Sequence, residues 1–133
     1  MKKLNSLLYL TICVLSLGCG SPESMKDFDS AAWKADKNAC KGDRARLAPE
    51  FEKIRNEMVE KKEYVVRNVL GKPDKENLLE RSQRIYYYYI EAGDQCQDAS
   101  KLSDANRLEV RINSLGKVSE VNYSHPEKLK KPE

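Results

Sequence analysis

The spacing of apolar residues predicts helical structure in the first half of the chain. Four of them recur at intervals of four, three and four, which places them on one side of a helix: Leu47, Phe51, Ile54 and Met58. Gly42 and Pro49 interrupt this region, so the pattern predicts a helix over residues 31–57 with a kink or restart near them. Asp29 or Ser30 can cap its first turn, because their side chains accept hydrogen bonds from free backbone N–H groups.

A second helix is predicted over residues 62–70. Its buried side consists of four apolar residues: Val65, Val66, Val69 and Leu70. Gly71 is suited to a left-handed C-cap, and Pro73 lies just beyond it, as is typical after a helix end. A valine-rich helix of this length is unstable alone in water, so it must pack against the rest of the domain.

Alternation of apolar and polar residues predicts a sheet in the second half of the chain. The expected strands cover residues 77–79, 84–90, 108–112 and 118–123. A long polar loop over residues 92–106 separates the second strand from the third. Val118 and Val121 break the alternation and predict a β-bulge in the last strand. The order of elements predicts an α+β fold, with two N-terminal helices packed on one face of a four-stranded antiparallel sheet.

Four successive tyrosines, Tyr86 to Tyr89, lie in the second predicted strand. Successive side chains of a strand point to opposite faces, so at least one pair of rings faces the core. Exposed tyrosines offer a large contact area at a small loss of conformational entropy, which suits partner binding. We expect Tyr86 and Tyr88 to point outward and bind a partner. The alternative is that both pairs pack in the monomer, one under the helices and one against the long loop.

The N-terminus has the pattern of an export signal. A charged start, Met1-Lys2-Lys3, precedes an apolar run over residues 4–17, which is shorter than the 20 or so residues of a membrane-spanning helix. Gly18-Cys19 then resembles the lipobox of bacterial lipoproteins, whose cysteine receives diacylglycerol and becomes the new N-terminus. The sequence therefore predicts a signal peptide over residues 1–18 and a lipidated tether over residues 19–27. The alternative is an ordinary secretory signal with an incidental cysteine.

The folded domain is predicted to cover residues 28–124. The charged, proline-containing segment over residues 125–133 can bury little apolar surface, so we expect a disordered tail. Loss of Lys2 and Lys3 with the signal lowers the formal net charge from +3 to +1. Charges of both signs alternate along the mature chain, which indicates a solvated surface and does not favour nucleic acid as a partner.

Two cysteines are left in the domain once Cys13 and Cys19 are assigned to the signal and the lipid. Cys40 and Cys96 are expected to form a disulfide, because an exported protein folds in an oxidising compartment. Two free buried thiols are the alternative. A metal site is not expected, because His125 is the only histidine and tetrahedral sites need about four ligands.

No combination of residues is typical of a catalytic site. The serines lack a credible base, because the single histidine lies in the predicted tail. Asp94, Asp98 and Asp104 in the long loop do not match the spacing of a calcium-binding loop. Trp33 is interpreted as a packing anchor rather than a ligand platform. We therefore expect neither enzymatic activity nor a cofactor.

Three features together resemble the SmpA/OmlA lipoprotein family. They are Val66-x-x-Val69-Leu70-Gly71-x-Pro73, the tyrosine-rich strand, and Leu108-x-Val110-x-Ile112-x-x-x-Gly116-Lys117-Val118. The family includes the small lipoprotein subunit of the outer-membrane β-barrel assembly machinery. Its fold is similar to one repeat of the β-lactamase-inhibitor protein, with two helices against an antiparallel sheet. Lys61 and Lys62 depart from the family, which usually has a Gly-Met-Thr-like motif there.

The resemblance implies a non-enzymatic envelope lipoprotein, anchored in the outer membrane and facing the periplasm. It would act as an adaptor that binds another envelope protein in outer-membrane assembly or maintenance. Two alternatives are open at this point. One is a structural or stress-type lipoprotein that contacts cell wall or lipid, and the other is an inhibitor of an exported enzyme.

Overall fold

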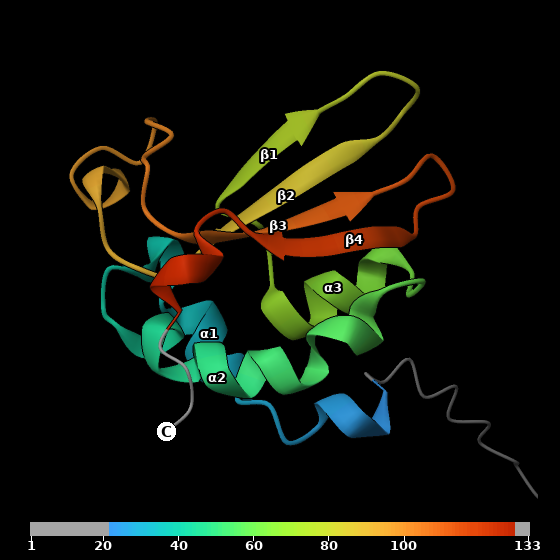
Figure 1. The fold of residues 1–133 in the computed structure, drawn as a ribbon, viewed down its shortest axis with the longest axis horizontal. Helices are drawn as coiled ribbons and strands as arrows, with labels where there is room; N and C mark the ends of the chain where they lie inside the picture. The colour runs from blue at the N-terminus through green and yellow to red at the C-terminus, as the bar shows by residue number, and fades with distance from the viewer. Residues whose placement is uncertain (1–21, 130–133) are drawn as a thin grey trace, which may run out of the picture.

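A four-stranded antiparallel sheet with helices on one side forms the domain (Figure 1). The computed structural model describes residues 22–129, so the predicted signal and the lipid site at Cys19 lie outside the described residues. The strands are β1 (Lys75–Leu78), β2 (Arg84–Tyr89), β3 (Arg107–Ile112) and β4 (Val118–Tyr123), in the spatial order β1-β2-β3-β4. The predicted α+β class and the four antiparallel strands are therefore confirmed.

Within residues 22–129, three α-helices precede the sheet: α1 (Ser30–Ala35), α2 (Asp43–Arg55) and α3 (Glu63–Leu70). Short 3₁₀ turns flank them and the later loops: η1 (Glu23–Met25), η2 (Lys37–Ala39), η3 (Asn56–Met58), η4 (Asp94–Cys96) and η5 (Pro126–Lys128). The second predicted helix corresponds to α3. The first is divided into α1 and α2. None of the helices between residues 22 and 129 is long and apolar enough to cross a lipid bilayer.

The division between α1 and α2 has a clear local cause. Asp29 caps α1, and its carboxylate accepts the Ala32 N–H at 3.0 Å. After α1, the buried carboxylate of Asp36 accepts the backbone N–H groups of Lys41 and Arg44, at 2.7 and 3.0 Å. These bonds close a turn that a continuous helix would not allow. The helix therefore restarts at Gly42, as predicted.

Pro49 lies inside α2 and does not break it. Its ring is on the exposed side of the helix, whereas Leu47, Phe51 and Ile54 are buried on the other side. Packing of that apolar side holds the helix together across a residue that cannot donate a backbone hydrogen bond.

α3 ends where the sequence predicts, at Gly71. This residue has φ +78° and ψ −163°, a conformation that is essentially restricted to glycine, although it is not the left-handed helical cap expected. A Cβ at this position would lie 2.9 Å from Cγ of Lys34. Both the backbone conformation and the close approach of α1 therefore require glycine here.

The predicted β-bulge is present between β3 and β4. Arg111 pairs with Glu120, but Ile112 pairs with Val118, so Ser119 is the extra residue. The insertion allows Val118 and Val121 to face the core despite their irregular spacing.

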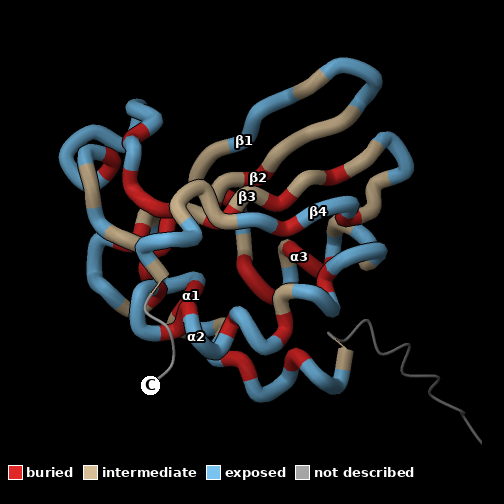
Figure 2. The backbone as a smooth tube through the Cα atoms, in the orientation of Figure 1, coloured by how far each residue is buried: buried red, intermediate tan, exposed pale blue. Residues whose placement is uncertain are grey.

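The core lies between the helices and the sheet, where buried positions of both layers meet (Figure 2). It extends beyond the predicted domain at both ends. Met25 is only 2% exposed, and Leu129 packs against the same cluster. Residues 126–128, which the sequence placed in a disordered tail, form η5 instead. Asn106 holds their start, because its side-chain oxygen accepts the His125 N–H at 2.9 Å and its side-chain nitrogen donates to the His125 carbonyl at 2.9 Å.

Candidate partner-binding surface

The prediction that Tyr86 and Tyr88 point outward is wrong. Both residues have no exposed surface, and both pack in the core beneath the helices. Their hydroxyl groups find partners on the helical layer. The Tyr88 hydroxyl donates to the Gly71 carbonyl at 2.8 Å, and the Tyr86 hydroxyl donates to the Glu63 carboxylate. Because groups of the helical layer form hydrogen bonds with both hydroxyls, this face of β2 can be buried in the core.

The Tyr86 hydroxyl belongs to a polar cluster at the edge of α3. Arg67 donates to it at 2.7 Å and lies 4.9 Å from the ring centroid, and Arg84 lies 3.6 Å from the Glu63 carboxylate. Burial raises the pKa of Glu63, but its hydrogen bonds to Tyr86 and Arg67 and the charge of Arg84 outweigh that effect and lower the pKa. Burial and the hydrogen bond to Glu63 raise the pKa of Tyr86. The cluster stabilises a negative charge on Glu63 and joins α3 to β2.

Tyr89 lies on the opposite face of β2 and is also fully buried. The long loop covers it, and the Ser103 N–H donates to its hydroxyl at 3.0 Å. Tyr89 forms a second small apolar cluster with Ala39 and Ala105. Of the four tyrosines, only Tyr87 is partly exposed. The alternative prediction placed one pair under the helices and the other against the long loop. It is correct for Tyr86, Tyr88 and Tyr89 and wrong for Tyr87.

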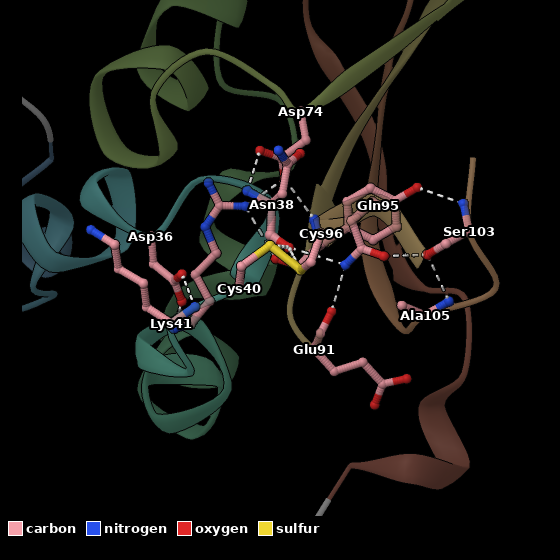
Figure 3. The surroundings of a disulfide bond; sticks show 12 residues. Asp36, Asn38, Cys40, Lys41, Asp74, Glu91, Gln95, Cys96, Ser103 and Ala105 are labelled. Carbon is pink, nitrogen blue, oxygen red and sulfur yellow. Dashed lines mark hydrogen bonds and ion pairs between the residues drawn. A yellow bond between two sulfur atoms is a disulfide. The ribbon is translucent and has the colours of Figure 1, made fainter. Parts of the chain in front are cut away.

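Cys40 and Cys96 form the predicted disulfide, with Cα atoms 5.7 Å apart (Figure 3). The bond joins η2 to the long loop at η4. Gln95, beside Cys96, is buried and donates to the carbonyls of Asn38 and Glu91 at 3.0 and 2.8 Å. The disulfide therefore holds the loop against the domain and keeps Tyr89 covered.

No helix of the described part of the chain covers the rest of this sheet face (Figure 1). Strand register places eight residues there in two rows that cross all four strands. The first row is Lys75, Tyr87, Glu109 and Asn122, and the second is Asn77, Ile85, Arg111 and Glu120. We call these eight residues the open face. Tyr87 and Ile85 are half-buried at its centre, and polar or charged residues surround them.

Arg107 lies at the boundary between the open face and the long loop. Its guanidinium lies 4.9 Å from the centroid of the Tyr87 ring and 2.9 Å from the Glu109 carboxylate. Its Nη1 donates to the Ser103 carbonyl at 3.2 Å. Nε of this side chain is buried and has no hydrogen-bond partner within residues 22–129. These contacts fix the orientation of the Tyr87 ring at the centre of the open face.

One ion pair on the open face crosses from β3 to β4. Arg111 lies 3.8 Å from Glu120, and the Asn122 amide donates to Glu120 at 2.6 Å. An aromatic and aliphatic centre within paired charges is typical of a protein-binding surface, where a few large side chains provide most of the affinity. The arrangement lacks the one-sided positive charge of a nucleic-acid surface.

A hollow lies between the end of α2 and the C-terminal turn. It has a volume of about 640 Å³, and its lining includes Glu52, Arg55 and Tyr123. Arg55 donates to the Val121 carbonyl at 2.8 Å and lies 5.9 Å from the Tyr123 ring centroid. Burial and the nearby Glu52 carboxylate raise the pKa of Tyr123. These contacts join α2 to β4, and we interpret them as structural.

Comparison of the chain with protein-family models, curated proteins and solved structures finds no match. The resemblance to the SmpA/OmlA lipoproteins therefore stays a prediction from the residues that carry it. The sequence pattern predicted exposed rings at Tyr86 and Tyr88, whereas Tyr87 is the half-buried ring of β2 that reaches the surface. A signal for the open face was present in the alternation of Arg107, Glu109 and Arg111 along β3, but only the register places Tyr87 beside them.

Proposed function

We propose that the protein is a non-enzymatic envelope lipoprotein that binds another protein through the open face. The observation that carries this proposal is the position of Tyr87 and Ile85 at the centre of a sheet face that no helix between residues 22 and 129 covers. The disulfide between Cys40 and Cys96 supports export, because such bonds persist in oxidising compartments. The resemblance to the SmpA/OmlA family supports a role in outer-membrane assembly or maintenance, with the domain on the periplasmic side.

Lipid attachment at Cys19 is part of the proposal. Several acyl chains, at about 0.8 kcal/mol per buried methylene, hold a protein at a membrane without a spanning helix. Labelling of growing cells with a fatty acid tests the attachment. We expect label on the wild type and on the Cys13→Ala variant, and none on Cys19→Ala. Label that persists on Cys19→Ala would contradict the assignment.

Site-specific photo-crosslinking in intact cells tests the binding surface. A photoreactive residue is placed at Asn122 on the open face, and at Lys53, an exposed position on α2, as the control. We expect a discrete protein adduct from position 122 only. Equal adducts from both positions would overturn the assignment of the surface. Adducts with glycan or lipid alone would support a structural lipoprotein instead.

Alanine substitution of two tyrosines provides a matched comparison. Tyr87→Ala on the open face should weaken the adduct-forming complex by about 2 kcal/mol or more, roughly 30-fold in affinity. Tyr64→Ala is the control, because Tyr64 is 56% exposed on α3 in the helical layer. Both variants should keep the wild-type circular dichroism spectrum. An unchanged adduct with Tyr87→Ala would show that the open face is not the binding surface.

A further inference from the structure

The folded domain begins very close to the proposed lipid. Met25 is 2% exposed and Phe28 is 7% exposed, and both belong to the main core. The Phe28 ring packs against two other aromatic rings, with centroids 5.6 Å from Trp33 and 5.9 Å from Phe51. The chain is therefore fixed to the domain from η1 onward.

Only residues 20–22 separate Cys19 from η1. Fully extended, the chain from Cys19 to Glu23 spans at most roughly 14 Å. A domain of about 100 residues has a radius of gyration near 13 Å, which corresponds to roughly 30 Å across. The tether is thus shorter than the domain, so the domain cannot turn freely above a membrane that holds its lipid.

η1 lies on the side of the helices that faces away from the sheet (Figure 1). In this view, the sheet and the β1–β2 hairpin lie on the opposite side of the helical layer from η1. The attachment point and the sheet are therefore at opposite ends of the domain, with the helical layer between them.

We infer that the bilayer surface is in contact with the η1 side of the domain, and that the tether directs the open face away from the membrane. This inference rests on the proposed lipidation of Cys19 and deepens the proposed function. It implies that the partner approaches from the side opposite the bilayer, with a surface outside the membrane. A partner segment embedded in the same bilayer could not reach Tyr87.

The tether, and not attraction between surfaces, accounts for this contact. Lys26 pairs with Glu23 in η1, and Asp27 and Asp29 add two exposed carboxylates nearby. This region has no excess of positive charge that would attract anionic lipid headgroups. Lengthening the tether should therefore release the domain, whereas a surface with its own membrane affinity would stay bound.

The experiment uses the full lipidated protein, reconstituted in vesicles of phosphatidylethanolamine and phosphatidylglycerol. A fluorescent amino acid is placed at Ser24 in η1 or at Asn77 on the open face, both of which are exposed. The vesicles contain a lipid with a nitroxide quencher at its headgroup. We expect quenching at least several-fold stronger at position 24 than at position 77.

A second set of proteins contains a Gly-Ser insertion after Gly20. About 15 inserted residues have a root-mean-square span of roughly 21 Å, so the domain can rotate and move away. Quenching at position 24 should then fall to the level found at position 77. Strong quenching at position 77 with the native tether would overturn the inferred orientation. A difference that persists with the long tether would overturn the tether as its cause.

The lipid assignment and the orientation of the domain can be tested separately. If the wild-type chain takes up no fatty acid and neither probe is quenched, the lipid assignment fails and this inference fails with it. If the lipid is present but both positions are quenched equally, only the orientation is wrong. Photo-crosslinking from Asn122 reports on partner binding independently of either result.

Discussion

The guanidinium of Arg44 and the carboxylate of Asp74 form an ion pair inside the protein, with side-chain exposures of 2% and 0%. Asp74 also accepts the backbone N–H groups of Asn38 and Tyr89, at 3.1 and 2.9 Å. Arg44 donates to the carbonyls of Trp33 and Tyr89, at 3.0 and 3.1 Å. The pair therefore joins α1, α2, η2 and the start of the sheet at one point. Asp74 is among the residues around the disulfide (Figure 3).

Replacement of Asp74 by alanine should be strongly destabilising. The substitution leaves the Arg44 charge buried without its counter-ion, which typically lowers the free energy of unfolding by about 3–5 kcal/mol. Urea unfolding followed by circular dichroism measures the change. Glu50→Ala is the control, because its pair with Lys53 is exposed and should contribute at most about 1 kcal/mol. Similar losses in the two variants would contradict a special role of the buried pair.

Removal of the disulfide should destabilise the domain and uncover Tyr89. Cys40 and Cys96 are 56 positions apart, and closure of a loop of this size stabilises by about 4 kcal/mol in the chain-entropy model. We expect the Cys40→Ser/Cys96→Ser variant to lose this amount in denaturant unfolding. Hydrogen exchange should show the first loss of protection in the long loop, at residues such as Ser103. Unchanged protection there would show that the loop is held without the bond.

Two glycines of positive φ differ in backbone conformation and in the space around them. Gly71→Ala forces a Cβ to within 2.9 Å of Lys34 in a conformation restricted to glycine, and should cost about 1–3 kcal/mol. Gly42 has φ +87°, but an added Cβ there has no atom within 4 Å. Gly42→Ala should therefore cost only about 1 kcal/mol, for the left-handed conformation alone. Thermal unfolding of both variants measures the difference, and equal losses would exclude a steric contribution at Gly71.

The lowered pKa of Glu63 predicts a contribution to stability that depends on pH. Because the folded pKa is below the ordinary value of 4.5, this contribution is present above pH 4.5 and is lost as pH falls through the folded pKa. The difference in unfolding free energy between wild type and Glu63→Gln, up to about 1 kcal/mol for a partly exposed group, should therefore shrink in acid. Urea unfolding from neutral pH to about pH 3 measures it.

Tyr86→Phe is the control for this pH dependence, because it removes the hydroxyl that donates to Glu63. In a Tyr86→Phe background, the effect of Glu63→Gln should vary less with pH. A difference that stays constant from neutral to acid pH in the wild-type background would show that the cluster does not stabilise the charged form of Glu63.

Local patterns were sufficient for most elements of this fold. The apolar run ending at Leu70, the glycine after it and the alternation along β3 each predicted an element that the structure contains. The disulfide followed from counting the cysteines left after a predicted export signal and lipid site are set aside. These features depend on residues close together in the sequence or on the compartment, so a linear pattern contains the information that they need.

The orientation of the tyrosine run depended on contacts between distant segments. Ile85 and Ile90 favour opposite faces equally, so the apolar pattern around β2 could not decide which rings are buried. Tyr86 is inside because Glu63 and Arg67 reach its hydroxyl, and Tyr88 because Gly71 presents a carbonyl. Such contacts arise only when α3 packs across β2. The local pattern of apolar residues does not indicate them.

The C-terminal end of the domain likewise depended on contacts with a distant segment. Charge and proline content predicted that residues 125–129 would not fold, and composition alone favours that outcome. Asn106, almost twenty positions earlier, pairs with His125 and brings Leu129 onto the core. The sequence by itself determined the elements and the disulfide through local spacing and composition. Only the tertiary structure decided which rings face solvent and where the domain ends, because those outcomes depend on hydrogen-bond partners supplied by remote parts of the chain.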